Sequence, residues 1–171
     1  LVDERTRIVN QLHSILKTYY PLAETLLGRQ MNQPMAADFL ARWPDLESLQ
    51  KAGPKALRAF CYKHNSRNSV KIEERLTALE KAIALTTDQA IITPARLLVE
   101  ALANILKPLH QAIARLDKEI ERAMDQHPDA AIFRSLPAAG SALAPRLLVA
   151  FGTNRDRFEN ALVRLVRHEP I

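Results

Sequence analysis

The chain has 171 residues, which is enough for one or two small domains with a buried core. Aromatic residues make up only 5% and glycines number four, so a composition dominated by Leu, Ala, Arg, Lys and Glu favours helices over a β-rich fold. The net charge is +5, the single Cys61 excludes an internal disulfide and suits the cytosol, and no run of about 18 apolar residues predicts a membrane span.

The first part of the chain predicts one long helix followed by short ones. Residues 1–20 carry a heptad-like apolar seam, with Arg5 at one inner position, and Pro21 ends the helix or begins the next. The seam comprises Leu1, Ile8, Leu12, Ile15 and Tyr19. A short helix followed by a loop is expected over residues 22–34, a short helix over 36–43 and a turn of helix over 45–49. Trp43 is interpreted as a core residue rather than a base-stacking platform.

The middle of the chain concentrates positive charge. Gly53-Pro54 predicts a break, followed by a helix to about Asn65 and, after a cap at Ser66 or Asn68, another to about Leu85. Residues 51–75 hold seven basic side chains against two acidic ones, an arrangement that fits either phosphate contacts or a solvated helical face. The seven are Lys51, Lys55, Arg58, Lys63, Arg67, Lys71 and Arg75.

A long helix is expected from a cap at 86–88 to Met124 or Asp125. Its apolar residues step by three and four, although Pro94 and Pro108 lie inside it. The predicted seam is Ile91, Ala95, Leu98, Leu102, Ile105, Leu109, Ile113, Leu116 and Ile120. Either the first helix or a second copy of the chain can cover this stripe. We therefore expect an all-α fold of long, antiparallel, coiled-coil-like helices with a cluster of short helices at one end.

Residues 136–152 predict a helix-hairpin-helix-like module. They read Leu-Pro-Ala-Ala-Gly-Ser-Ala-Leu-Ala-Pro-Arg-Leu-Leu-Val-Ala-Phe-Gly, a tight turn entering an apolar helix, and a second turn follows at 152–154. Backbone N–H groups of such turns and helix N-termini point at anions. The expected phosphate contacts here are Gly140, Ser141, Arg146, Arg155 and Arg157.

No catalytic or metal constellation is visible in the sequence. The five histidines are scattered, Cys61 and His64 alone do not make a metal site, and no phosphate-binding loop or nucleophile elbow occurs. Ser141 is interpreted as a helix cap. The chain by itself is expected to lack catalytic residues and cofactors.

Two stretches resemble the insertion-sequence "one-ten" transposases. One is Leu1 to Leu12 followed by the Tyr19-Tyr20-Pro21 corner, and the other is the module at 136–158 with its later Arg157-Phe158. The order of parts is also similar. Ala138 departs from the family pattern, because it stands where the first glycine is usual and its Cβ restricts positive φ.

The resemblance implies a bacterial cytoplasmic protein acting on DNA, and on structured RNA as well. A metal-binding RuvC-like domain with Mg would precede Leu1, and the catalytic serine would lie beyond Ile171, so we expect a fragment of a longer protein. Residues 1–130 would form a helical dimerisation region that makes a homodimer. Residues 131–171 would begin the C-terminal transposase domain.

Three hypotheses about function follow. The first is a non-catalytic transposase fragment that dimerises and binds nucleic acid. The second is a coiled-coil interaction module with no nucleic-acid role. The third is a helix-hairpin-helix module of a DNA repair or recombination factor, which predicts DNA binding that survives deletion of residues 1–130.

Overall fold

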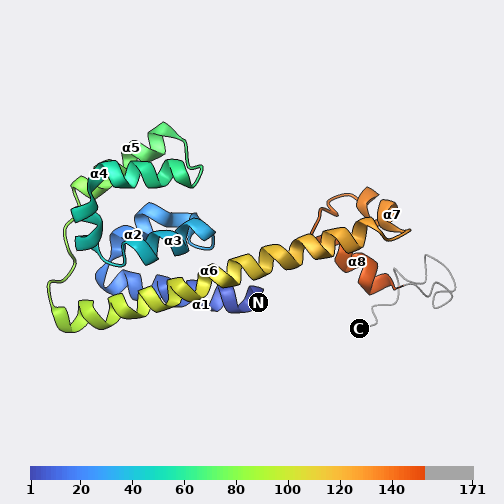
Figure 1. Ribbon diagram of the computed structural model, residues 1–171, viewed down its shortest axis with the longest axis horizontal. Coiled ribbons are helices and arrows are strands. Elements are labelled where there is room, and N and C mark those ends of the chain that lie inside the picture. The colour runs from blue at the N-terminus through green and yellow to red at the C-terminus, as the bar shows by residue number, and fades with distance from the viewer. Residues whose placement is uncertain (153–171) are drawn as a thin grey trace. The chain divides into compact units, whose positions relative to one another are not determined.

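A computed structural model describes residues 1–152 of the chain, and every regular element in that range is a helix (Figure 1). The predicted all-α fold is confirmed over this range, whereas its coiled-coil detail stays a prediction. The described residues separate into two compact units that divide after Ala114. This division lies inside the longest helix, and the predicted domain boundary at 130/131 stays a prediction.

The first unit begins with helices whose ends follow local sequence signals. Helix α1 spans Val2–Tyr19, α2 spans Pro21–Leu27, a 3-10 turn η1 spans Gly28–Gln30, and α3 spans Pro34–Arg42. Pro21 and Pro34 each occupy the first helical position, where the missing N–H costs nothing. The boundary predicted at Pro21 is confirmed, whereas Pro34 begins α3 instead of lying in the predicted loop.

Two further helices, α4 over Leu46–Lys63 and α5 over Ser69–Glu80, form a corner. The Asp45 side chain caps α4 by accepting from the Ser48 N–H at 2.7 Å, and Asn68 caps α5 by accepting from the Lys71 N–H at 3.0 Å. The predicted break in α4 is confirmed at Gly53, whose φ of +76° is a conformation that L side chains rarely adopt.

Aromatic rings hold α3 and α4 together in the core of this unit. Trp43 is 3% exposed, and its ring lies edge-on to Phe39 at 5.3 Å and to Phe60 at 5.2 Å between centroids. Such edge-to-face arrangements suit the quadrupoles of the rings. The interpretation of Trp43 as a core residue is confirmed.

Helix α6, Gln89–Asp125, runs antiparallel to α1 within the first unit. Arg5, near the start of α1, lies close enough to His110 of α6 for its charge to lower the pKa of that histidine. Tyr19, at the end of α1, lies close enough to Arg96 and Glu100 of α6 for their charges to shift its pKa. Residues near the start of α1 thus face later residues of α6. The expected antiparallel pair of long helices is present, and both contribute to one apolar core.

The face of α6 that the core buries is rotated from the predicted seam. Val99, Ala103 and Leu106 are fully buried, although the seam did not include them. Leu102, Leu109 and Ile113 of the seam are buried too, whereas Ile91, Leu98 and Ile105 are 45–51% exposed. The heptad pattern therefore indicated an apolar stripe wider than the surface that one neighbouring helix covers.

The end of α5 and the apolar character of α6 differ from the sequence predictions. Helix α5 ends at Glu80 rather than near Leu85 as predicted. The side chains of Ile83 and Leu85 are exposed, so they add no core contacts that would extend the helix. By length and composition alone α6 could cross a membrane, because one 18-residue window has a mean hydropathy of 1.3. The core helix of a soluble protein passes the same test, and the absence of a membrane partner stays a prediction.

The described part of the second unit consists of the end of α6, α7 over Ala130–Ser135 and α8 over Leu143–Phe151. Met124, Ala130, Phe133, Ala139 and Ala144 form a small core, to which Phe151 adds a ring 5.2 Å from that of Phe133. The turn between α7 and α8 is the segment in which the sequence predicted a phosphate-binding loop.

Candidate nucleic-acid interface

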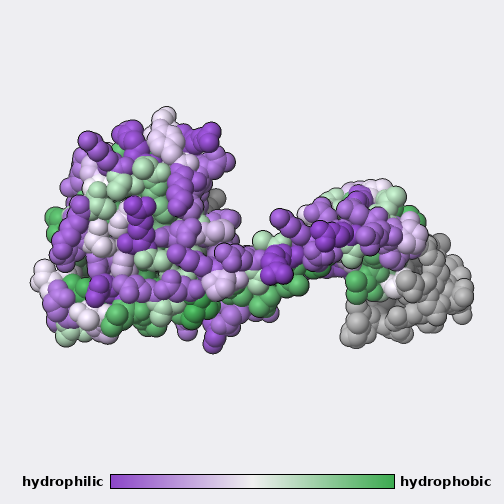
Figure 2. Space-filling view, viewed as in Figure 1, coloured by the Kyte–Doolittle hydropathy of each residue, from purple (hydrophilic) through white to green (hydrophobic). Residues whose placement is uncertain are grey.

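The predicted basic segment maps onto α4, α5 and the corner between them. Six of its seven side chains are exposed, and Arg75 is partly buried. Figure 2 shows hydrophilic residues over the part of the first unit where α4 and α5 lie. The fold therefore exposes most of these cations on α4, α5 and the corner between them rather than burying them in the core.

Ion pairs divide the exposed cations into two groups. Lys51 Nζ lies 2.6 Å from Glu47, and the Arg58 guanidinium lies 2.8 Å from Glu73. Within the described part of the chain, the other four exposed cations of the segment have no ion pair with a carboxylate. They are Lys55, Lys63, Arg67 and Lys71. A phosphate can approach these four without first displacing a carboxylate.

Arg75 has a structural role that the sequence did not indicate. Its Nε donates to the Leu26 carbonyl at 3.0 Å, and its two terminal nitrogens donate to Ser66 Oγ at 3.0 Å and Gln30 Oε1 at 2.8 Å. The guanidinium also lies 3.6 Å from the Cys61 sulfur. These bonds join α5 to α2, η1 and the α4–α5 corner, and they occupy most of the guanidinium edge.

A cleft of about 590 Å³ lies beside Arg75 within the first unit. Its charged side chains are Arg67, Lys71, Glu74 and Arg75, and Gln30, Asn65, Ser66 and Asn68 add uncharged hydrogen-bonding groups. Three of the seven predicted cations thus share one concave site. We call it the corner cleft. Lys51, Lys55, Arg58 and Lys63 lie outside it.

The contribution of Gln30 and Asn65 was not anticipated from the sequence. Gln30 belongs to a 3-10 turn far from the basic segment in the chain, so only the packing of α2 against α5 brings it to the cleft. For Asn65 the sequence offered a weak indication of a turn, because Asn tolerates the left-handed conformation. In the structure its φ is +57°. Neither residue lies in a recognisable motif.

The predicted turn of the second unit has an unexpected conformation. Ala138 has a φ of +63°, whereas Gly140 does not adopt positive φ. The Gly140 carbonyl accepts from the N–H groups of Leu143 and Ala144 at 3.1 and 3.0 Å, so α8 in effect begins there. Ala138, where the family resemblance predicts a glycine, therefore holds left-handed backbone at a cost of about 1–2 kcal/mol.

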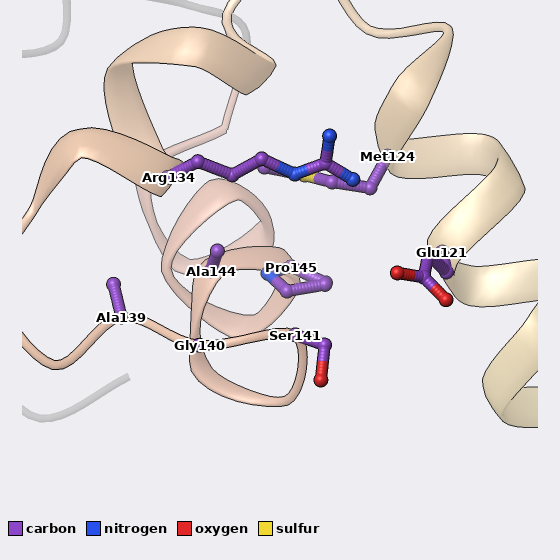
Figure 3. Close-up of a pocket in the computed structure, with 8 residues that line it drawn as sticks. All are labelled: Glu121, Met124, Arg134, Ala139, Gly140, Ser141, Ala144 and Pro145. Carbon is purple, nitrogen blue, oxygen red and sulfur yellow. The ribbon is translucent and has the colours of Figure 1, made fainter.

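A small pocket adjoins this turn inside the second unit (Figure 3). Gly140 and Ser141, for which phosphate contact stays a prediction, line it together with the Glu121 side chain of α6. Arg134 also lines it and is paired with Asp125. An anion entering here would meet the Glu121 carboxylate, which opposes the attraction of the α8 N-terminus.

The remaining predicted contacts divide between the described and undescribed parts of the chain. Arg146 is exposed on α8 and does not line the pocket, and Arg155 and Arg157 lie outside the described residues. Within residues 1–152, no group of three or more His, Cys, Asp or Glu side chains could hold a metal ion. The prediction that another domain holds Mg is untested.

The chain is similar to two proteins of insertion elements. No family model matches it, and no solved structure matches it. It is 26% identical over 157 residues to the uncharacterized 43.6 kDa protein of the insertion element IS110 from Streptomyces coelicolor. It is 27% identical over 164 residues to a protein of the same organism named as a candidate transposase of the mini-circle IS117.

These matches cover 89% and 94% of the chain but only 37% and 40% of the two relatives. The chain thus spans about two-fifths of the length of the curated relatives that it matches. Because the similarity covers about nine-tenths of the chain rather than one helix, repetitive helical composition does not account for it. The relationship predicted from the Tyr-Tyr-Pro corner and the 136–158 module is confirmed, and this chain is related to the transposases of the IS110 family.

Proposed function

We propose that this chain serves a transposase as a non-catalytic part that binds nucleic acid and self-associates. The observation that carries the proposal is the group of exposed, unpaired cations at the α4–α5 corner of a chain whose relatives include a candidate transposase. Phosphate neutralisation by Lys and Arg is the main, sequence-independent source of affinity for nucleic acids. DNA is the proposed partner, with structured RNA as the alternative that the resemblance implies.

The arrangement of charges favours this function over a merely solvated surface. A helical face that only needs solubility is commonly laced with alternating signs. Here Lys55, Lys63, Arg67 and Lys71 are exposed without a carboxylate partner in the described part of the chain. Such an uncompensated patch raises the local concentration of a polyanion and speeds its association.

Charge reversal at the patch tests the nucleic-acid role. A Lys55→Glu, Lys63→Glu variant should weaken binding to a labelled duplex across sequences. It should also lower the slope of log affinity against log salt by about two, since two phosphate contacts are lost. Lys17→Glu with Lys81→Glu is the matched control, because both are exposed lysines of the first unit outside the basic segment. Equal effects of patch and control would remove the patch from the account.

Self-association is supported by the part of the α6 seam that the fold leaves uncovered. Ile91, Leu98 and Ile105 recur every seven residues and are 45%, 47% and 51% exposed. Figure 2 shows hydrophobic residues along the border of the first unit where α6 runs. Exposed apolar residues at heptad spacing are the pattern with which one helix packs against another. A second copy of the chain is the proposed partner.

The association is testable by introducing charge into the exposed stripe. Leu98→Glu with Ile105→Glu should shift sedimentation from a concentration-dependent dimer to a monomer, because two carboxylates would be buried at the interface. Asn104→Glu on the same helix, also exposed, should leave the dimer intact. A wild-type chain that stays monomeric at high micromolar concentration would contradict this half of the proposal.

A further inference from the structure

The corner cleft is large for a phosphate contact. Its volume of about 590 Å³ falls in the range of roughly 300–1,000 Å³ that is typical of sites enclosing a small organic ligand. A phosphate of a duplex backbone contacts surface cations and needs no cavity. The bases of a duplex are stacked inside it and cannot enter a recess on a protein surface without being unpaired.

The lining also differs from that of a simple anion site. Arg67, Lys71 and Arg75 supply positive charge, but Glu74 lies among them, and the Asn65 and Gln30 amides add donors and acceptors. A carboxylate disfavours a bare phosphate and can accept a hydrogen bond from a base edge. The lining therefore matches a ligand that carries both an anionic phosphate and a polar ring.

The rigid guanidinium of Arg75 fits the same ligand. Its edge is engaged by Leu26, Ser66 and Gln30, so the face of the group is what remains for a ligand in the cleft. Unpaired bases stack on arginine planes as they do on aromatic rings. Lys71 lies in the first turn of α5, beyond the Asn68 cap, where the helix dipole adds to the attraction for an anion.

We propose that the corner cleft binds one unpaired nucleotide of a single-stranded nucleic acid. The phosphate is held by Arg67 and Lys71, and the base is stacked on Arg75 within reach of Asn65 and Glu74. This inference rests on the proposed nucleic-acid-binding function and adds the form of the strand. Arg75 acts through its fixed plane, while Lys55 and Lys63, outside the cleft, contribute charge to any strand.

The test compares single-stranded and duplex 12-mers of the same sequence, labelled for anisotropy, on the full chain at constant salt. An Arg67→Gln, Lys71→Gln variant should lose at least about tenfold more affinity for the single strand than for the duplex, to which the same two cations give only phosphate contacts. A matched Lys55→Gln, Lys63→Gln variant, with the same loss of charge outside the cleft, should weaken both ligands by similar factors.

The outcomes separate this inference from the function on which it rests. If neither ligand binds the wild-type chain, the proposed function itself fails. If both bind but the cleft variant weakens them equally, nucleic-acid binding stands and the single-nucleotide site is overturned. A nucleoside monophosphate that binds as tightly as the 12-mer would also overturn it, because the ligand would then be a free nucleotide rather than a strand.

Discussion

Replacing Ala138 by glycine should stabilise the second unit. Ala138 holds a φ of +63°, in the left-handed region, where an L residue with a Cβ costs about 1–2 kcal/mol relative to glycine. Glycine also adds entropy to the unfolded chain, which opposes the gain by about 0.4–1 kcal/mol. The net expectation is a stabilisation of about 0.5–1 kcal/mol, or roughly a two- to fivefold change in the opening equilibrium.

Hydrogen exchange measured by mass spectrometry is the suitable assay, because Trp43 lies in the first unit and its fluorescence does not report on the second. Amides of α7 and α8 should exchange about two- to fivefold more slowly in Ala138→Gly, while α3 and α4 should be unchanged. Ala139→Gly is the matched control: Ala139 is 8% exposed and does not adopt positive φ, so this change should speed exchange.

Faster exchange in both glycine variants would refute the reasoning. The loss of backbone entropy would then outweigh any strain at Ala138, and the turn would not need left-handed backbone at that position. Unchanged exchange in Ala138→Gly alone would mean that strain and entropy cancel, which also contradicts the predicted sign.

Two further predictions concern the first unit. Phe60→Ala should lower the free energy of unfolding of this unit by about 3–5 kcal/mol, because the Phe60 ring packs against both Phe39 and Trp43. Urea unfolding followed by Trp43 fluorescence measures the loss. Burial lowers the pKa of His110, and the Arg5 charge lowers it further. The unfolded chain therefore takes up the proton first as the pH falls. The contribution of His110 to the free energy of unfolding should be fully present above about pH 6.5 and decrease below it. His110→Gln should flatten that pH dependence, and an unaltered profile would remove His110 as its source.

Local signals predicted much of the fold. Pro21 begins α2 and Asn68 caps α5 as their chemistry suggests, and Gly53 supplies the positive φ that breaks α4. These features depend on a few neighbouring residues, which is why a sequence is enough to find them. The rotation of the buried face of α6 was missed, because it depends on which helix of the core lies beside it.

The candidate site shows the same division between local and tertiary information. The local excess of lysine and arginine, a property of the sequence alone, indicated the segment that carries Arg67 and Lys71. It could not separate Arg75, whose partners Leu26 and Gln30 come from earlier helices, from cations that face solvent. Nor could it place a carboxylate beside the predicted turn, because Glu121 arrives there from another helix.

Salt-dependent binding of the wild-type chain to nucleic acid is the most direct test of the central claim. Anisotropy titrations with a labelled single strand and duplex from about 50 to 200 mM salt would count the neutralised phosphates. Four contacts, one for each unpaired cation at the α4–α5 corner, predict that affinity falls about 50- to 150-fold over this range. No binding at the lowest salt, or binding that does not respond to salt, would contradict the claim that this chain binds a nucleic-acid backbone.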